Sequence, residues 1–81
     1  MKVRVLFFGA LKDVVGRSED CVQVDSGWDV ARLFERYSHL FPALEKHRSS
    51  TLFSRNREFV SLGERLNDGD EVAFLPPVSG G

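Results

Sequence analysis

The residues best suited to chemistry stand at the end of the sequence, where Gly80 and Gly81 follow a proline-containing segment. Glycine has no Cβ atom, so two successive glycines can enter a channel too narrow for other residues and carry a carboxylate to a buried reactive centre. A frayed terminus is the alternative interpretation, because chain ends are commonly disordered and rich in small residues. We expect any chemistry of this chain to take place at the Gly81 carboxylate.

The side chains offer little else for catalysis. His39 and His47 have no metal-ligand spacing to each other or to Cys21. Residues 68–71 (DGDE) resemble the start of a calcium loop but lack the register and the distal glutamate of an EF-hand. Serine, histidine and aspartate all occur, yet no G-x-S-x-G turn or candidate triad accompanies them. We therefore expect no bound metal or cofactor and no side-chain active site.

Length and composition indicate one small globular domain. The chain has 81 residues, of which 42% are hydrophobic and 28% are charged, and its formal net charge is -1. A domain of this size has room for only a modest core, and a near-neutral charge balance gives no signature of nucleic-acid binding. Neither a deep internal active site nor a nucleic-acid partner is expected.

The cysteine count and the first residues bear on the cellular compartment. The single Cys21 excludes an internal disulfide, which fits a reducing cytoplasm. The opening MKVRVLFFGAL superficially resembles a signal peptide, but Arg4 interrupts its apolar run and no small-residue cleavage pattern follows. No stretch is long enough to span a bilayer. We expect a cytoplasmic protein that does not bind a membrane.

A strand and a proline pair should position the terminal glycines. Residues 71–75 (EVAFL) have the β-branched and aromatic content of a strand, and residues 67–70 (NDGD) have the composition of a turn. Pro76 and Pro77 fix two successive φ values and lack the backbone N–H, so the chain leaves the sheet as a stiff arm. We predict a folded domain over residues 1–75 and an extended tail over residues 76–81.

The first quarter of the chain is predicted to form two strands around a short helix. Residues 10–15 suit one or two helical turns that Gly16 would stop, and residues 19–25 alternate in polarity as a strand does. Residues 2–9 alternate as well, and the set expected on the core face is Val3, Val5 and Phe7.

The middle of the chain is predicted to form the main helix. An apolar stripe at helical spacing marks residues 28–40 and consists of Val30, Leu33, Phe34 and Tyr37. Ser26 is the predicted N-cap, with Asp29 three residues further on as in a capping box. Pro42 ends this helix, and residues 43–48 suit a further helical turn.

The remaining elements complete an α+β fold. Residues 52–55 and 58–61 are predicted to pair as a hairpin around a turn at Asn56 and Arg57. The order is then strand, strand, helix, two short strands and a last strand. One main helix crossing a mixed sheet is the arrangement of the β-grasp fold, with the last strand parallel to the first.

Parallel pairing of the first and last strands would gather apolar side chains at the root of the tail. Alternation places Phe8 near Leu75, both on the face away from Val72 and Phe74, and Phe59 on the outer hairpin would extend this patch. Exposed apolar clusters of this kind usually mark a partner surface. We therefore predict that Phe8, Phe59 and Leu75 contact a partner.

These residues resemble the small, sulfur-carrier subunits of molybdopterin synthases, and the likeness runs from end to end. It is carried at the front by residues 5–8 (VLFF) and 14–16 (VVG), and above all by residues 68–81 (DGDEVAFLPPVSGG). The middle matches in pattern more than in identity, and Arg55 stands where an apolar strand residue is usual.

The resemblance implies a ubiquitin-like β-grasp domain that carries sulfur. An adenylating enzyme of the ubiquitin-activating type would use ATP to adenylate Gly81, and sulfur from a donor would displace AMP to give a thiocarboxylate. The arm would enter the large subunit of a heterotetrameric molybdopterin synthase, which would hold the catalytic side chains and convert cyclic pyranopterin monophosphate to molybdopterin. Besides the apolar patch, the implied partner contacts are Pro76, Pro77, Val78, Ser79 and Gly80.

Three other functions fit parts of the sequence. A thiamine-pathway sulfur carrier shares the fold, the Gly-Gly end and the activation chemistry, although residues 74–78 (FLPPV) fit it less well. A ubiquitin-like protein modifier would transfer Gly81 to substrate lysines. A simple interaction module would need no free C-terminus at all.

Overall fold

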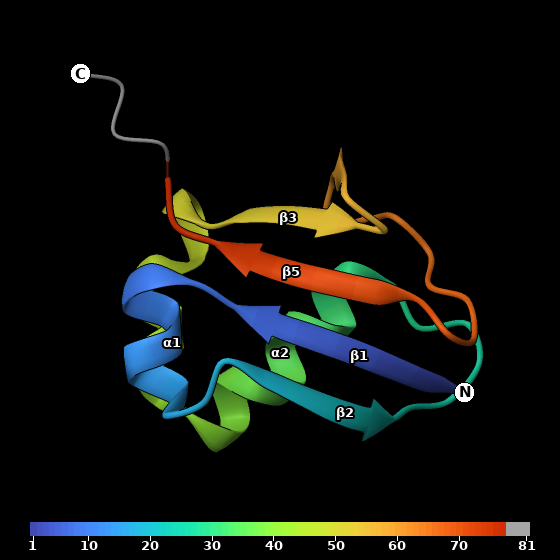
Figure 1. The fold of residues 1–81 in the computed structure, drawn as a ribbon, viewed down its shortest axis with the longest axis horizontal. Coiled ribbons are helices and arrows are strands. Elements are labelled where there is room, and N and C mark those ends of the chain that lie inside the picture. Colours follow the sequence, from blue (N-terminus) through green and yellow to red (C-terminus); the bar gives the residue numbers. More distant parts are fainter. Residues whose placement is uncertain (78–81) are drawn as a thin grey trace.

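Five strands form one mixed β-sheet in the computed structural model, which describes residues 1–77 (Figure 1). The order of strands across the sheet is β2-β1-β5-β3-β4. The pair β1 and β5 is parallel, and the other neighbouring pairs are antiparallel. The strands are β1 (Lys2–Phe7), β2 (Glu19–Gln23), β3 (Leu52–Arg55), β4 (Glu58–Val60) and β5 (Glu71–Leu75). This mixed sheet confirms the predicted β-grasp fold.

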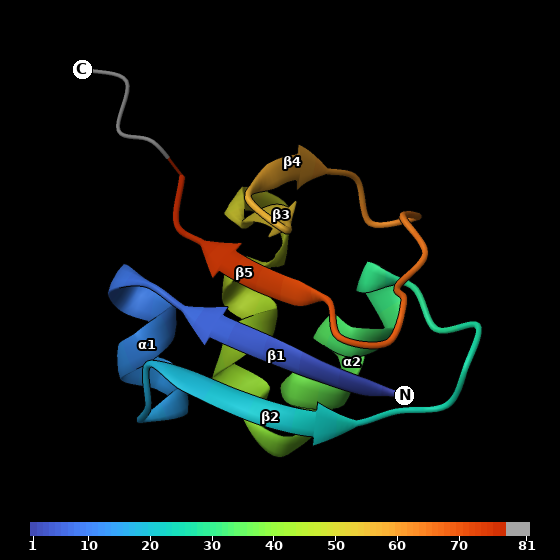
Figure 2. The same cartoon turned by 45° about the vertical axis from the view of Figure 1, so that its right-hand side comes forward.

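The first and last strands lie side by side at the centre of the sheet and point the same way (Figures 1 and 2). Their register pairs Arg4 with Glu71 and Phe7 with Phe74. The carboxyl ends of β1 and β5 therefore meet at one edge, where the chain after Leu75 leaves the sheet. The parallel pairing predicted from the element order is confirmed.

The helices cover one face of this sheet. Helix α1 (Gly9–Val15) ends at Gly16, whose φ of 83° is left-handed and whose N–H donates to the carbonyl of Lys12 at 2.8 Å. Helix α2 (Val30–Leu40) crosses behind the strands and is followed by the 3₁₀ helix η1 (Pro42–Ser50) (Figure 2). The predicted extra turn is thus a longer 3₁₀ segment that begins at the proline.

The start of α2 differs from the prediction, and the predicted cap at Ser26 is wrong. Asp29 is the N-cap, and its Oδ1 accepts a hydrogen bond from the N–H of Arg32 at 2.9 Å. The reason is a contact from outside the helix, since Asp29 forms a β-bridge with Arg65 and the Trp28 carbonyl accepts from the N–H of Leu66. Residues held extended by the 61–66 loop cannot enter the first helical turn.

An aromatic cluster fills the core between sheet and helices. The Phe74 ring lies 5.3 to 5.9 Å from four other ring centroids, those of Phe7, Phe34, Tyr37 and Phe53. Most of these contacts are edge-to-face, the geometry that aromatic rings prefer. All four residues of the predicted helix stripe are buried. Strand β5 is therefore anchored in the core two residues before the proline pair.

Arg55 is accommodated without a change of register. It pairs with Val72 in the β3–β5 ladder, which places it in a row of otherwise inward-facing residues. Its guanidinium reaches the 61–66 loop, where Nη1 donates to the carbonyl of Arg65 at 2.7 Å and lies 3.4 Å from the Glu64 carboxylate. The charged side chain thus binds the same loop whose carbonyls at Leu62 and Glu64 accept hydrogen bonds from the first N–H groups of α2.

None of the helices in residues 1–77 is long and apolar enough to cross a membrane.

Candidate functional site

The root of the C-terminal arm is held against the chain that follows β1. A Cβ atom added at Gly9, where φ is +56°, would lie 2.9 Å from Cγ of Pro76, so the proline ring packs directly on this backbone. Pro76 is half-buried and Pro77 is exposed. The remaining predicted site residues, which are Val78, Ser79, Gly80 and Gly81, lie outside the described residues.

Phe8 and Leu75 share a shallow cavity of about 390 Å³ on the sheet face away from the helices. Leu6 and Ala73, which pair across β1 and β5, form the floor between them. Phe8 is 44% exposed although it follows a strand whose alternate residues are fully buried. The structure therefore brings these two predicted residues together at the arm root, as strand alternation predicts.

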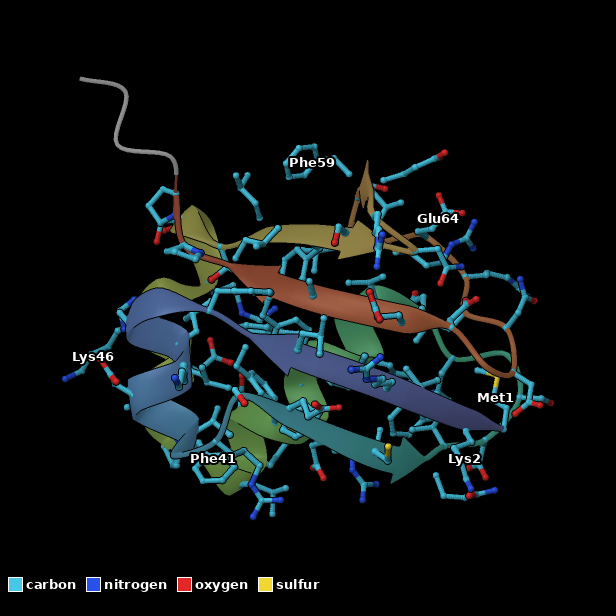
Figure 3. The ribbon with its side chains drawn as sticks, in the orientation of Figure 1. Met1, Lys2, Phe41, Lys46, Phe59 and Glu64 are labelled. Atoms are coloured by element: carbon cyan, nitrogen blue, oxygen red, sulfur yellow. The ribbon has the colours of Figure 1, made fainter. Side chains whose placement is uncertain are left out.

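Phe59 lies apart from that cavity. Its side chain is 73% exposed and projects beyond β3 (Figure 3). It lines a separate apolar groove of about 680 Å³ near the β4 edge of the sheet, together with Leu52, Val60 and Leu62. The structure does not join Phe59 directly to Phe8 and Leu75, and its contact with a partner stays a prediction.

Charged groups occupy the other end of the same sheet face, and Arg4 and Glu71 also line the cavity that holds Phe8 and Leu75. Arg4 on β1 donates from Nε to the Glu19 carboxylate at 2.8 Å and from Nη1 to the Glu71 carboxylate at 3.1 Å. The hydrogen bond with Glu19 raises the pKa of Arg4 and lowers the pKa of Glu19, and both groups face solvent. The face is thus divided into a charged half and an apolar half, and the apolar half adjoins the arm.

The described side chains do not assemble a metal centre. Nowhere in residues 1–77 do three histidine, cysteine, aspartate or glutamate side chains come together so that they could hold a metal ion. Cys21 is an exposed free thiol on β2.

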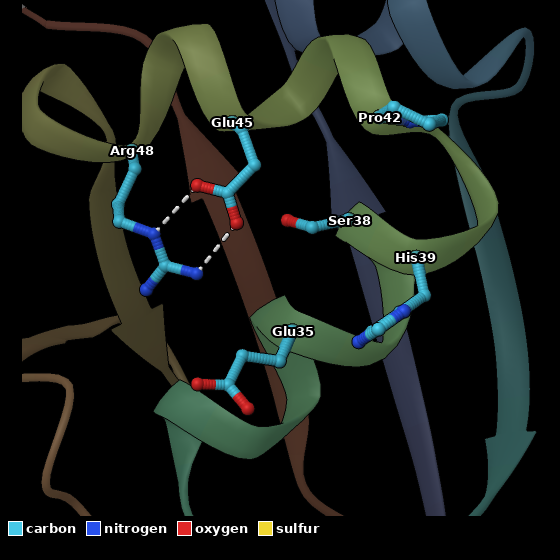
Figure 4. Close-up of a pocket in the computed structure, with 6 residues that line it drawn as sticks. All are labelled: Glu35, Ser38, His39, Pro42, Glu45 and Arg48. Atoms are coloured by element: carbon cyan, nitrogen blue, oxygen red, sulfur yellow. Dashed lines mark hydrogen bonds and ion pairs between the residues drawn. The ribbon is translucent and has the colours of Figure 1, made fainter.

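Sequence reasoning missed a polar cavity between α2 and η1. Its one buried member is Ser38 of α2 (Figure 4). The signal was present in the sequence, because Ser38 stands one residue after Tyr37 and four after Phe34, within the reach of the apolar stripe.

The sheet order, the single long helix behind it and the arm that leaves beside the first strand define a ubiquitin-like β-grasp protein. Residues 5–81 match the model of the ThiS family, so the chain belongs to the ThiS family.

One named relative and two solved structures are similar to this chain over most of its length. It is 37% identical to the molybdopterin synthase sulfur carrier subunit of Mycobacterium tuberculosis, over 100% of this chain and 99% of that protein. It is 30% identical to small archaeal modifier protein 1 of Haloferax volcanii, with a TM-score of 0.84 over 95% of this chain and 98% of that one. It is also 26% identical to a chain in the complex of subunits 1 and 2 of the molybdopterin-converting factor from Helicobacter pylori, with a TM-score of 0.70 over 100% of both chains.

Proposed function

We propose that this chain is the sulfur carrier subunit of a molybdopterin synthase. The observation that carries the proposal is the match of 37% identity over the whole chain to a relative of that name. The short step from the anchored strand β5 to Pro76 and Pro77 supports it, because a carrier must present its terminus beyond a rigid domain.

The chemistry takes place at Gly81. A carboxylate is a poor acyl donor until one of its oxygens can leave. An adenylating enzyme of the ubiquitin-activating type therefore joins it to the AMP part of ATP and releases pyrophosphate. A sulfur donor at the hydrosulfide level then attacks the acyl carbon, and AMP departs with the oxygen. The product is a thiocarboxylate at the end of the arm.

The thiocarboxylate is the sulfur nucleophile for the next reaction. Within the large subunit, two successive transfers add sulfur to cyclic pyranopterin monophosphate. These two sulfur atoms form the dithiolene of molybdopterin. At each transfer the acyl carbon gives up its sulfur and takes an oxygen from water, which restores the carboxylate. The similarity to one chain of the Helicobacter pylori two-subunit complex supports a large-subunit partner, and we propose a heterotetramer.

The apolar half of the outer sheet face provides the docking surface in this proposal. Phe8 and Leu75 lie at the root of the arm, so a partner that covers them is also placed to receive Gly81. The adenylating enzyme and the large subunit need the same tail at different times. We propose that both cover this patch and therefore compete for it.

Intact mass measurement tests the proposed function. The full chain is incubated with an adenylating enzyme, ATP and a sulfur source, and we expect the mass gain of one oxygen replaced by one sulfur. Digestion should place the gain on the C-terminal peptide. A known sulfur carrier, treated with the same enzyme in parallel, is the positive control. If that carrier is thiocarboxylated and the mass of this chain stays unchanged, the proposal is contradicted.

A second candidate function is protein modification. It is favoured by the 30% identity and matching fold of a solved structure named small archaeal modifier protein 1. In that function the activated Gly81 forms an isopeptide bond with a lysine amine in place of accepting sulfur. Lysines of other proteins that carry the C-terminal peptide of this chain through an isopeptide bond, found after denaturing purification, would support it, and the absence of such adducts from cells that make molybdopterin would favour sulfur transfer alone.

A further inference from the structure

We propose that Arg57, in the turn between β3 and β4, binds a carboxylate side chain of the large synthase subunit when that subunit covers the outer sheet face. The outer face is the one away from the helices. The inference rests on the proposed sulfur-carrier function, because it adds a charged contact to the docking surface formed by Phe8 and Leu75. Arg57 is a specificity-determining residue in this proposal and takes no part in the reaction at Gly81.

The first argument is the backbone conformation of the turn. Asn56 and Arg57 form a two-residue loop between Arg55 and Glu58, which pair across β3 and β4. Their φ angles are 52° and 72°, and within residues 1–77 they are the only residues other than glycine with a positive φ. A type I′ hairpin turn requires positive φ at both central residues and favours glycine at the second. The chain thus holds an arginine at a position where glycine would be less strained.

The second argument is that the surrounding structure fixes this turn. The N–H of Asn56 donates to the Glu71 carbonyl at 2.7 Å, and its side-chain oxygen accepts from the N–H of Glu71 at 3.0 Å. The Asn56 amide also donates to Oδ1 of Asp70 at 3.0 Å, and Asp70 is buried. An unfavourable backbone conformation persists where neighbouring contacts determine it, and such positions are common at functional sites. All these bonds belong to Asn56, so they hold Arg57 in place without using its guanidinium.

The third argument is the charge on the outer face. Arg57 and Arg4 line the same cavity as Phe8 and Leu75. Arg4 already has two carboxylate partners, whereas Arg57 has no ion pair or side-chain hydrogen bond within residues 1–77. The neighbouring Glu58 pairs directly with Arg55 and shares the opposite face of the sheet with it. The charge of Arg57 is therefore available to a partner, and an anion is the complementary group.

The place of Arg57 shows that a protein, and not a small anion, is the fitting occupant. Strands β3 and β5 run in opposite directions (Figure 1), and Arg55 pairs with Val72, so the turn lies beside the start of β5. Phe8 and Leu75 line the cavity at the other end of β5, where the arm begins. One protein surface with apolar side chains and a carboxylate can cover both ends, whereas a free anion would gain nothing from the apolar end.

A carboxylate is the anion that a protein offers, and the guanidinium of arginine can bind its two oxygens with parallel N–H groups. Of the two proposed partners, the large subunit is the one supported by similarity to a chain in a solved two-subunit complex. We therefore assign the carboxylate to an aspartate or glutamate of the large subunit.

Calorimetric titration of full-length variants with the large subunit tests the contact. Arg57→Gln should weaken binding about tenfold, as expected for a lost hydrogen bond between charged groups. The difference from the parent chain should shrink as salt is raised, because exposed ion pairs are screened. Arg36→Gln is the matched control, since it removes the same charge from an exposed arginine of α2 on the helical side, and it should bind like the parent chain.

Arg57→Gly separates a role in binding from a role in folding. Glycine adopts a φ of 72° without strain, so this variant should melt at or above the temperature of the parent chain while its binding falls by the same factor as that of Arg57→Gln. A lower melting temperature with unchanged binding of the folded chain would assign Arg57 to the fold and overturn the proposal.

Carbodiimide cross-linking identifies the facing group. Arg57→Lys keeps the positive charge and supplies a primary amine, which carbodiimide joins to a carboxylate in direct contact through an amide bond. Mass spectrometry of the digested complex should show position 57 linked to an aspartate or glutamate of the large subunit, and Arg36→Lys should give no such link at position 36. A complex that forms without a cross-link at position 57 would overturn the proposal.

Leu75→Glu distinguishes failure of this contact from failure of the proposed function. If Leu75→Glu weakens large-subunit binding and Arg57→Gln does not, the docking surface stands and the Arg57 contact is wrong. Weaker binding of Arg57→Gln to the adenylating enzyme alone would also overturn the assignment to the large subunit. If the parent chain neither binds a large subunit nor becomes thiocarboxylated, the proposed function fails and this inference fails with it.

Discussion

The backbone N–H of Phe8 donates a hydrogen bond to the carbonyl oxygen of Phe74 at 3.2 Å. This bond extends the contact between β1 and β5 to the point where both strands end. It places the Phe8 side chain next to Leu75, the last residue before the proline pair. The proposed docking surface and the root of the arm are thereby joined by one backbone contact.

The first prediction concerns this surface. Leu75→Glu and Phe8→Glu should each weaken binding to the adenylating enzyme and to the large synthase subunit by about 2 kcal/mol, or roughly 30-fold, as for a desolvated interface anchor. Fold stability should change little, because neither side chain belongs to the buried core. Calorimetric titration and thermal melts measure the two effects separately.

Leu40→Glu is the control for that prediction. Leu40 is a 62% exposed leucine at the end of α2, away from the arm. If it weakens both complexes as strongly as Leu75→Glu, the loss reflects added charge and the docking surface lies elsewhere. A large fall in melting temperature for Leu75→Glu, with binding retained in the folded fraction, would instead assign Leu75 to the core.

The second prediction concerns the length of the tail. Deletion of Gly81, or addition of one residue after it, should abolish sulfur transfer because the reacting carboxylate is removed or displaced. Folding should be unaffected, since the last residue of the buried core in residues 1–77 is Phe74. Circular dichroism and an in vitro molybdopterin assay test the two parts together. A truncated chain that still supports product formation would refute terminal chemistry.

The third prediction concerns the core. Phe34→Ala should lower the free energy of unfolding by about 3 to 5 kcal/mol and Leu33→Ala by about 2 to 5 kcal/mol, because both residues are 0% exposed and each change leaves a cavity. Phe34 additionally loses its contacts with the rings of Phe53 and Phe74. In a domain this small such losses can unfold it. Urea midpoints equal to that of the parent chain would mean that the helix presents another face to the sheet.

The fold was predictable because local and global signals agree in most elements. Strict alternation in β1 and the stripe of α2 each assign one face to the core, and the structure buries Val3, Val5 and Leu33 completely. The last strand was predicted over residues 71–75 and occupies Glu71–Leu75. Polarity patterns of period two and 3.6 are local, so they can be read without knowing the tertiary contacts.

The features that could not be predicted depend on distant parts of the chain. The N-cap of α2 is Asp29 and not Ser26, because a β-bridge with Arg65 accompanies the extended backbone of Asp29. Phe59 and Leu75 are both outward residues of the sheet, yet alternation does not tell that they line different cavities. The position of Ser38 beneath η1 likewise follows from how two helices pack, which the spacing of residues within one helix does not specify.

The fourth prediction follows from the corrected helix cap. Asp29→Ala should destabilise the domain by about 1 kcal/mol, because the N–H of Arg32 loses its acceptor. Ser26→Ala is the matched control and should have no comparable effect, since Ser26 does not cap the helix. Chemical denaturation of both variants measures the difference. An equal loss of unfolding free energy in the two variants would instead support the capping box at Ser26 that the sequence suggests.

The last prediction compares two buried hydroxyls, of which one lacks a hydrogen-bond partner and the other has one. Ser38 Oγ has no partner among the described residues, whereas Thr51 Oγ1 donates to the carbonyl of His47 at 2.6 Å. Ser38→Ala removes an unsatisfied group and places a better helix former in α2, so it should raise the free energy of unfolding by about 1 kcal/mol. Thr51→Val keeps the shape but deprives a carbonyl of its donor, and should lower it by about the same amount. Chemical denaturation compares the two, and a loss of stability in Ser38→Ala would mean that its hydroxyl already has a partner, such as a buried water.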